Sequence, residues 1–282
     1  MFKNIIIIPI YNDWRSLNKL LFEINKILSS SDLYKILIIN DCSTQRIDIS
    51  KKKLKKIKEI KILSLKENLG SQKSISIGLD YLKRLNKKFY ITIMDGDGED
   101  SPREIKKMLI EAKKKSNYVV ASNRKERNEN FIIKFSYKLH LIISFFLTWH
   151  WISFGNFSCF NSKNLKKLDL DDVWYAYSAA IAKNCNIKNL YASRQKRYFG
   201  NSKVNFLSLI GHSFRIMSVF YKKIFIISLL LLSVIFSFYS EFLFIFITAI
   251  IFINSIIVFI KFKNYKKSSV NLASFIKNVR NI

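Results

Sequence analysis

Residues 89–102 read FYITIMDGDGEDSP, an apolar run that ends abruptly in four carboxylates. The apolar part, Phe89–Met94, is rich in β-branched and aromatic residues, which predicts a buried strand. Two glycines in the acidic part, Asp95–Asp100, permit a tight turn directly after that strand. Crowded carboxylates repel one another unless a cation neutralises them, and Mg²⁺ prefers one or two carboxylates plus phosphate oxygens. The stretch therefore predicts a strand that ends at a divalent-metal site.

The acidic cluster has a second interpretation, as a solvated turn that caps a helix beginning at Pro102. A D-x-D pair alone would favour this second interpretation. The strand before it and the polar residues that follow other predicted strands favour the metal site instead. Both interpretations place the cluster in a loop between a strand and a helix.

Strands and helices alternate along the N-terminal half of the chain. Apolar runs predict strands at 4–10, 34–40, 60–65, 89–94 and 118–121. Helical spacing of apolar residues predicts helices at 17–28, 71–85 and 102–115. This alternation indicates βαβ units and a mostly parallel sheet, in which ligands bind at the carboxyl ends of the strands. The polar residues that follow four of these strands are 9–13 (PIYND), 40–43 (NDCS), 67–71 (ENLGS) and 95–100 (DGDGED).

The charge balance limits the class of partner. Lys and Arg total 48 against 20 Asp and Glu, a formal net charge of +28. This excess excludes an acidic calcium protein and leaves a nucleic acid or an anionic membrane surface as the common partners of such a chain. The sequence contains no recognisable helix-turn-helix or zinc module, so we expect no nucleic-acid partner. P-loop and G-x-G-x-x-G phosphate loops are missing as well.

The stretch Ile224–Ile260 favours the membrane, because its only charged residue is Glu241. A helix of this length would extend roughly 55 Å, against a hydrocarbon core of about 30 Å, so two spans fit and one does not. The break is expected at 239–241 (YSE). Basic residues flank the pair on both sides and none lies in the connecting loop, which places both flanks in the cytoplasm. The alternative is a buried hairpin in a soluble core.

Two further segments, Phe131–Phe154 and Val204–Tyr221, mix aromatic, aliphatic and basic residues. This mixture is typical of amphipathic helices that lie in a membrane interface, and an ordinary core helix is the alternative. The expected domains are a cytoplasmic catalytic domain (1–203, including an interfacial helix at 130–154), a juxtamembrane amphipathic helix (204–221), two transmembrane helices (222–260) and a basic cytoplasmic tail (261–282). Three cysteines without metal-like spacing also favour a reducing compartment.

Six motifs in order carry a family resemblance: IIIIPIYND, INDCST, NLGSQKSISIGLDYL, ITIMDGDGEDSP, VVASNRKERN and RYFGNSK. Together they resemble family 2 glycosyltransferases, which have the GT-A fold. The last motif, R-x-x-G-x-S-K, followed by a paired membrane hairpin resembles polyprenyl-phosphate glycosyltransferases of the dolichol-phosphate mannose synthase and undecaprenyl-phosphate glucosyltransferase types. The similarity extends to about residue 265.

The resemblance implies an α/β fold, with a GT-A nucleotide-sugar-binding domain, and a membrane-bound hexosyltransferase. The expected reaction moves a sugar from a nucleotide sugar, UDP-glucose-like or GDP-mannose-like, to a polyprenyl phosphate such as undecaprenyl phosphate. Mg²⁺ or Mn²⁺ is the expected cofactor, and the expected location is the inner membrane, with the catalytic domain facing the cytoplasm. A role in cell-envelope biosynthesis and a homo-oligomer are further expectations. The alternatives are a family 2 enzyme that acts on a hydroxyl of a cell-surface glycan or glycolipid, and a membrane-tethered scaffold with an inactive site.

The resemblance also implies roles for individual residues. Those implied to contact the nucleotide are Pro9, Tyr11, Asn12, Asp41, Gly70, Lys73 and Asp95. Those implied to hold the metal are Asp95, Asp97 and Glu99. Those implied to act in catalysis, through the metal or the donor and acceptor phosphates, are Asp97, Arg124, Arg197 and Lys203.

The chain departs from the family pattern at three places. Asn40 and Cys42 replace an Asp and a Gly of the loop that contacts the base, and residues 155–160 (GNFSCF) lack the arginine of an acceptor motif. A hydroxyl acceptor would require a general base, for which Asp171 and Asp172 are the candidates. The favoured interpretation of these two is an N-cap pair for a helix at 173–183.

Overall fold

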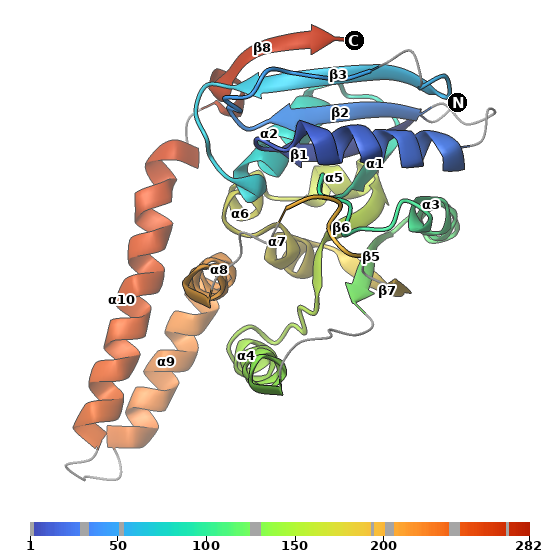
Figure 1. Cartoon of the computed structure of the whole chain (residues 1–282). Helices are drawn as coiled ribbons and strands as arrows, with labels where there is room; N and C mark the ends of the chain where they lie inside the picture. Colours follow the sequence, from blue (N-terminus) through green and yellow to red (C-terminus); the bar gives the residue numbers. More distant parts are fainter. Residues whose placement is uncertain are drawn as a thin grey trace. The chain divides into compact units, whose positions relative to one another are not determined.

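The computed structural model describes residues 3–28, 34–50, 54–124, 131–192, 195–200, 206–236, 243–268 and 271–282. The chain divides into two compact units, and Figure 1 shows the elements of each. The first unit comprises residues 1–128, 153–203 and 271–282, and the second comprises residues 129–152 and 204–270. The predicted boundaries therefore differ from the observed ones at two places. Residues 129–152 belong with the later helices, and the last twelve residues belong with the sheet.

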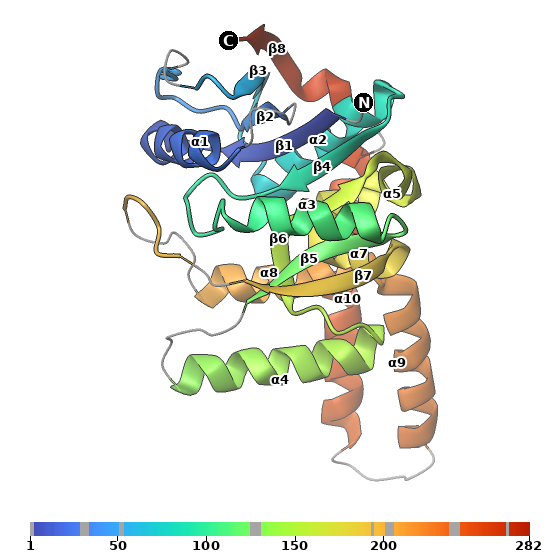
Figure 2. The ribbon, with the colours of Figure 1, turned by 90° about the vertical axis from the view of Figure 1, so that its right-hand side faces the viewer.

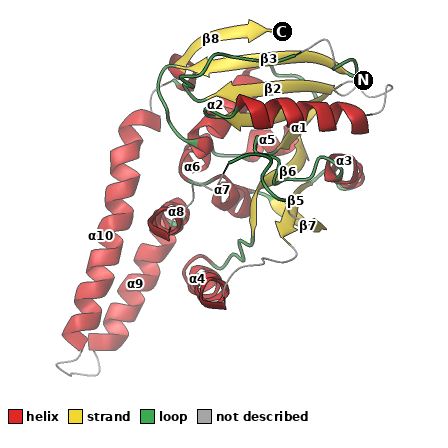
Figure 3. Ribbon diagram, viewed as in Figure 1, coloured by secondary structure: helices red, strands yellow, loops and turns green. Residues whose placement is uncertain are grey.

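A mixed eight-stranded sheet forms the centre of the first unit, in the order β7-β5-β6-β4-β1-β2-β3-β8. Figure 3 draws the strands in yellow. β1 pairs in parallel with β2 and with β4, and β2 pairs in parallel with β3. β5 and β7 also form a parallel pair. β6 and β8 pair antiparallel with their neighbours. The α/β class and the largely parallel sheet are confirmed. The strands are β1 Lys3–Ile10, β2 Tyr34–Asn40, β3 Ile57–Leu65, β4 Phe89–Ile93, β5 Tyr118–Arg124, β6 Phe154–Asn161, β7 Asn186–Ala192 and β8 Ile276–Asn281.

Helices cover both faces of this sheet, because successive residues of its central strands point to opposite faces and are apolar on both. Ile6 and Ile8 of β1 belong to a buried cluster with apolar residues of α1 and α3. Ile7 points the other way, toward Gly78 of α2, where an added Cβ would lie 3.4 Å from the Ile7 side chain. The helices of this unit are α1 Trp14–Ile27, α2 Ser71–Arg84, α3 Glu104–Lys114, α5 Ser162–Lys167, α6 Leu170–Tyr175 and α7 Tyr177–Asn184, and a 3₁₀ turn, η2, spans Leu272–Phe275.

The expected basic tail at 261–282 is not a separate segment. Residues 261–268 continue helix α10, and β8 pairs antiparallel with β3 at the edge of the sheet. Phe275, just before β8, accepts a backbone hydrogen bond from Lys66 (3.0 Å), and its ring lies 5.4 Å from that of Trp174. β8 (IKNVRN) has no alternation of apolar and polar residues and is almost entirely exposed, so its sequence does not indicate a strand.

The second unit consists of helices α4 Phe131–Thr148, α8 Phe206–Val219, α9 Tyr221–Phe236 and α10 Leu243–Ser268. The expected break at 239–241 lies outside the described residues, between α9 and α10. Within the part of the chain that the structure describes, no single helix is long and apolar enough to span a membrane. Ile210–Val219 and Tyr221–Ser233 meet the length and composition criteria only as a pair bent by 92°, and Phe246–Lys261 is a shorter apolar helix. The transmembrane hairpin therefore stays a prediction.

Candidate active site

The four polar segments predicted from the sequence follow β1, β2, β3 and β4. These strands are neighbours in the sheet, in the order β4-β1-β2-β3, and all run parallel. Figure 2 shows β1 and β4 side by side. Parallel strands end at the same edge of a sheet, so the loops that follow them gather there. The segments 9–13, 40–43, 67–71 and 95–100 therefore form one candidate site at this edge.

The acidic loop after β4 is held by its own hydrogen bonds. The Asp100 carboxylate accepts a bond from the Asp95 backbone N–H (3.0 Å), and Asp97 Oδ1 accepts one from the Glu99 N–H (3.0 Å). Gly98 has φ of +87°, and a Cβ there would lie 2.3 Å from the Tyr198 ring. Only glycine fits that position, both in conformation and in space. The loop can therefore approach the segment that carries Tyr198.

Residues 195–200 lie along this acidic loop. The backbone N–H groups of Gln195 and Tyr198 donate to the carbonyls of Glu99 (2.9 Å) and Asp97 (3.0 Å). The Arg197 guanidinium forms ion pairs with Asp97 (3.2 Å) and Asp13 (2.6 Å). The sequence motif that contains Arg197 is thus brought to the D-x-D carboxylates, although about a hundred residues separate them.

Two aromatic side chains attach the same segment to helix α1. The guanidinium of Arg15 lies 3.9 Å from the centroid of the Phe199 ring, and the Lys19 ammonium lies 4.6 Å from that of Tyr198. Cation–π contacts of this kind contribute about 0.5–1 kcal/mol each at exposed positions. They help to keep Arg197 between the loop after β1 and the loop after β4.

A chain of hydrogen bonds fixes the first carboxylate of the D-x-D pair. Asp95 Oδ1 accepts from Asn156 Nδ2 (3.0 Å), and Asn156 Oδ1 accepts from Gln72 Nε2 (3.0 Å). Gln72 Oε1 accepts in turn from the backbone N–H of Tyr177 (2.7 Å). Asn156 reaches Asp95 because β6 runs antiparallel to β4, with Ser158 opposite Ile93. The Asp95 carboxylate is therefore oriented by side chains from β6 and α2.

Asp41 closes the loop between β3 and α2. Its carboxylate, 3% exposed, accepts hydrogen bonds from the backbone N–H groups of Leu69 (2.8 Å) and Gly70 (2.7 Å). Burial raises the pKa of Asp41, and these two hydrogen bonds oppose the rise. Gly70 is the N-cap of α2 and has φ of +86°. Asp41 thus shapes the loop that the family resemblance assigns to the nucleotide.

The loops after β1 and β2 are tied together by Asn12. Its Oδ1 accepts from the backbone N–H groups of Thr44 (2.9 Å) and Gln45 (3.2 Å), and its own N–H donates to Ser43 Oγ (3.0 Å). Asn12 has φ of +50°, a conformation that costs energy and recurs at functional sites. Tyr11 beside it is 39% exposed.

The remaining predicted residues fall in different places. Pro9 is buried within β1, and the Lys73 ammonium lies 5.2 Å from the centroid of the Trp174 ring. Arg124 ends β5, but its side chain is outside the described part of the structure, and so is all of Lys203. Their contacts with phosphate stay predictions.

The chemistry of the donor set fits a divalent ion held by two carboxylates. Asp95 and Asp97 follow the same strand and supply hard oxygen donors at the edge where ligands bind. Among the described residues, no group of three or more His, Cys, Asp or Glu side chains is placed to hold a metal. Glu99 is therefore not assembled with the other two as a third ligand, and that role stays a prediction. Diphosphate oxygens and water would supply the remaining oxygen ligands.

The two candidate general bases lie in the first turn of helix α6. The N-cap of that helix is Asp169, which accepts from the Asp171 N–H (2.9 Å), so the expected N-cap pair was placed two residues too late. Asp172 is 2% exposed and forms an ion pair with Lys183 (2.7 Å). Its carboxylate thus stabilises the packing of α6 on α7.

Sequence reasoning missed four contributors to the site: Asp13, Gln72, Asn156 and the Tyr198–Phe199 pair. Asp13 is the only charged residue of the segment 9–13 (PIYND), and the family resemblance implies no role for it. Amide side chains such as Gln72 and Asn156 carry no charge pattern that would reveal them. Their contribution depends on the register of β6 against β4, which the sequence does not specify.

A family model described as "Glycosyl transferase family 2" matches residues 5–184, more than half of the chain. The Bacillus subtilis protein "Uncharacterized glycosyltransferase YkcC" is 27% identical over 131 residues, 46% of this chain and 39% of that relative. The Synechocystis "Uncharacterized glycosyltransferase sll0501" is 26% identical over 140 residues, 48% of this chain and 42% of that relative. The matched part thus spans about two fifths of the length of these curated relatives.

Among solved structures, the chain is similar to glucosyl-3-phosphoglycerate synthase from Mycobacterium tuberculosis, with a TM-score of 0.53. The two are 10% identical, and the similarity covers 79% of this chain and 80% of that one. That enzyme was crystallised in complex with Mn²⁺, UDP-glucose and phosphoglyceric acid. At this identity the likeness concerns the fold alone.

Proposed function

Because the chain belongs to glycosyl transferase family 2 and is a glycosyltransferase, we propose that it moves a sugar from a nucleotide sugar to a polyprenyl phosphate. The observation that carries this proposal is the contact between Arg197 and Asp97, 3.2 Å apart. A carboxylate that can hold a metal and an arginine that can hold a phosphate lie next to each other. This pairing suits a reaction in which both donor and acceptor carry phosphate.

The donor side of the proposal rests on the loops after β1 to β4. A base and ribose would lie between Tyr11 and the loop that Asp41 holds in place, and the diphosphate would lie at Asp95 and Asp97. The structural relative that binds Mn²⁺ and UDP-glucose supports a nucleotide-sugar donor for this fold. Both UDP and GDP sugars are compatible with these residues.

In the proposed reaction, negative charge develops on the leaving nucleotide diphosphate. A Mg²⁺ or Mn²⁺ ion held by Asp95 and Asp97 would offset that charge. Asn156 keeps the Asp95 carboxylate in position, since it donates to Oδ1. Arg197 can donate two parallel hydrogen bonds to a phosphate once its bonds to Asp97 and Asp13 rearrange. These residues bind and orient the reactants, and none of them has to move a proton.

The acceptor side favours a phosphate over a hydroxyl. A phosphate monoester is ionised at neutral pH and needs positioning more than a general base. A hydroxyl would need a base, and Asp172 is buried in an ion pair with Lys183. A carboxylate neutralised in this way is a poor proton acceptor. The second candidate function, transfer to a glycan hydroxyl, therefore depends on Asp171.

Attachment to a membrane is part of the proposal, and the second unit supports it. Asn254 of α10 donates to Ser228 of α9 (2.8 Å), so the two helices contact each other through a polar bond. Lys223, at the start of α9, donates to the Thr148 carbonyl (2.9 Å) and lies 4.2 Å from the centroid of the Trp149 ring. Amphipathic aromatic and lysine side chains are typical of the headgroup level. The large apolar side chains of α9 and α10 that are at least half exposed are Phe225, Ile226, Leu229, Leu230, Phe246, Ile251, Phe252 and Phe259.

The membrane proposal predicts that the full chain floats with lipid vesicles in a density gradient. Trp149 and Trp151, 68% and 50% exposed, should contribute to binding, so W149A/W151A should reduce the floated fraction. Tyr191 of β7 is 63% exposed in the first unit and provides the matched control, since Tyr191→Ala removes a similar aromatic side chain. Wild-type chain that stays with the soluble fraction at every lipid composition would contradict the proposal.

The reaction itself predicts a defined product. Protein purified in detergent should convert undecaprenyl phosphate to a glycosylated lipid when offered the correct member of a panel of nucleotide sugars with Mg²⁺ or Mn²⁺. Mass spectrometry of the lipid fraction detects the added sugar and identifies it. Hydrolysis of a donor without a lipid product, together with transfer to a glycan or glycolipid in parallel reactions, would favour the hydroxyl acceptor.

A further inference from the structure

A pocket lies at the amino ends of the parallel strands, and the proposed reaction makes no use of it. Its volume is about 520 Å³. In the sheet, Lys35 of β2 lies beside Ile5 of β1 and Glu59 of β3, and Leu37 lies beside Lys61. The pocket is thus built on one face of three neighbouring strands, at the edge opposite the candidate active site.

Helix α2 leaves this part of the sheet face open. Further along the strands, Gly78 of α2 packs against Ile7 and Ile39 on the same face. The helix ends at Arg84, before it reaches the first residues of β1 and β2. On this face of the sheet, the side chains under the helix are therefore isoleucines, and those beyond its end include lysines.

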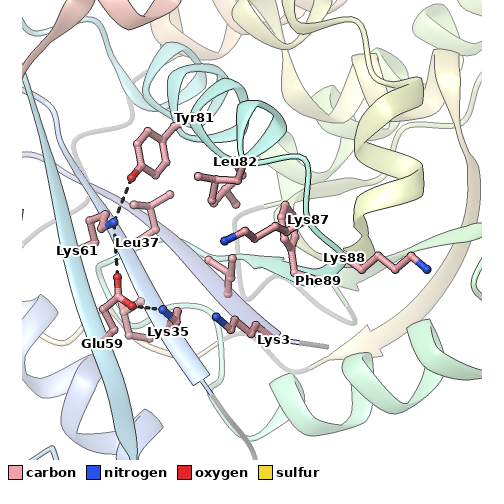
Figure 4. Close-up of a pocket in the computed structure, with 13 residues that line it drawn as sticks. Lys3, Lys35, Leu37, Glu59, Lys61, Tyr81, Leu82, Lys87, Lys88 and Phe89 are labelled. Carbon is pink, nitrogen blue, oxygen red and sulfur yellow. Dashed lines mark hydrogen bonds and ion pairs between the residues drawn. The ribbon is translucent and has the colours of Figure 1, made fainter. Parts of the chain in front are cut away.

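Positive charge is in excess in this pocket. The lysines that line it are Lys3, Lys35, Lys61, Lys87 and Lys88, and Glu59 is the only acidic residue among the described residues of the lining. Glu59 forms ion pairs with Lys35 and Lys61, and the Lys61 ammonium also donates to the Tyr81 hydroxyl (3.1 Å). In Figure 4, Lys3 and Lys87 extend toward this group, whereas Lys88 points away from it. The amines of Lys35 and Lys61 are thus fixed at the wall by Glu59, and those of Lys3 and Lys87 reach over the opening.

The floor of the pocket is apolar. Leu37, Leu82 and Phe89 are buried and line it together with Ile5. Small-molecule sites of a few hundred Å³ combine such a floor with a few polar groups that fix the orientation of the ligand. A ligand that satisfies several ammonium groups here must be multiply charged, and one that covers the floor must have an apolar or planar part.

We propose that this pocket binds a soluble small molecule with two or more phosphate groups on a planar or apolar body. Lysine is a common phosphate ligand, as a compact point charge. Lys35 and Lys61 would contact the phosphates nearest the wall, and Lys3 and Lys87 those at the opening. The headgroup of an anionic lipid presents the same phosphate chemistry, so the test separates the two sources.

The test is calorimetry with inorganic tripolyphosphate and with ATP, on the full chain in detergent with EDTA. K3Q/K87Q should weaken the binding of both probes by about tenfold, because it removes two exposed charges and leaves the Lys35–Glu59–Lys61 group intact. The matched control is K106Q/K113Q, which removes two exposed lysines of α3. Glu59→Gln should tighten the binding of both probes, since it removes a carboxylate that now pairs with Lys35 and Lys61. ATP should bind more tightly than tripolyphosphate.

Each result bears on the proposal. Equal binding by the K3Q/K87Q and K106Q/K113Q variants would overturn it, because the lysines would then contribute only to general charge or to the stability of the end of α2. If neither soluble probe binds the wild type, while K3Q/K87Q alone reduces flotation with phosphatidylglycerol vesicles, the phosphate comes from a lipid headgroup and the soluble ligand is wrong. Binding of ATP no tighter than tripolyphosphate would remove the planar body from the proposal. None of these variants alters a residue of the candidate active site, so the proposed reaction can fail independently.

Discussion

Asp97→Asn is expected to lower the turnover number by about 10²–10³-fold, the loss typical of removing one electrostatic contact to the transition state. Asparagine has the shape of aspartate and can still accept the backbone hydrogen bond from Glu99. It lacks the charge that would hold a metal and that now pairs with Arg197. The loss should therefore come from the chemistry of the site, with the loop unchanged.

The measurement is the initial rate of lipid glycosylation as a function of Mg²⁺ or Mn²⁺ concentration. EDTA should abolish the wild-type rate, and added metal should restore it. Asp169→Asn is the matched control, because asparagine also caps a helix and Asp169 lies outside the site. Thermal unfolding of both variants shows whether the fold is kept. A folded Asp97→Asn variant with the full wild-type rate would exclude Asp97 as a metal ligand.

The sequence alone predicted most of the parallel part of the sheet. Apolar runs predicted β1, β2 and β4 to within one residue at each end, since buried central strands consist almost entirely of apolar residues. The helix predicted at 71–85 was observed as Ser71–Arg84. The loops after these strands could then be placed at one edge, because parallel strands share their direction.

The strands that the sequence did not reveal are those with partial burial or antiparallel pairing. β6 begins Phe-Gly-Asn, and the predicted acceptor segment at 155–160 lies within it. β7 is exposed or half-exposed at every residue before Ala192. A helix predicted at 173–183 is split at Ala176, whose φ of −156° is an extended conformation. Tertiary packing determines whether such strands and helices form and where they end, and the local sequence pattern does not indicate that packing.

The candidate site was predicted in part for a similar reason. Charged residues at strand ends, such as Asp41, Asp95 and Asp97, are visible as breaks in an apolar pattern. Contacts between distant segments, such as Asp13 with Arg197 or Asn156 with Asp95, need the register of the strands. The family resemblance predicted that Arg197 contacts phosphate. Its ion pairs with Asp13 and Asp97 are seen only in the structure.

Arg197→Ala is expected to damage lipid glycosylation strongly, by about ten- to a hundredfold. Charge-assisted hydrogen bonds from arginine to phosphate contribute about 1.5–3 kcal/mol each, which converts to a factor of this size. Arg197→Lys should recover only part of the loss, because lysine keeps the charge but lacks the planar fork. The loss should appear mainly in the dependence of the rate on polyprenyl phosphate concentration, since a phosphate acceptor is what the guanidinium would hold.

Substitution of Asp171 and Asp172 distinguishes the two candidate acceptors, because a hydroxyl acceptor needs a general base and a phosphate acceptor does not. Asp171→Asn and Asp172→Asn should leave the rate per folded molecule near the wild-type value, as an ionised phosphate needs no deprotonation. Asp172→Asn should lower the thermal stability, since it breaks the ion pair with Lys183, so rates must be normalised to the folded fraction. A hydroxyl acceptor predicts that one of these variants is almost inactive while folded. If that variant loses more than about a thousandfold, and Arg197→Ala keeps the wild-type acceptor dependence, the polyprenyl phosphate acceptor is wrong and a glycan hydroxyl takes its place.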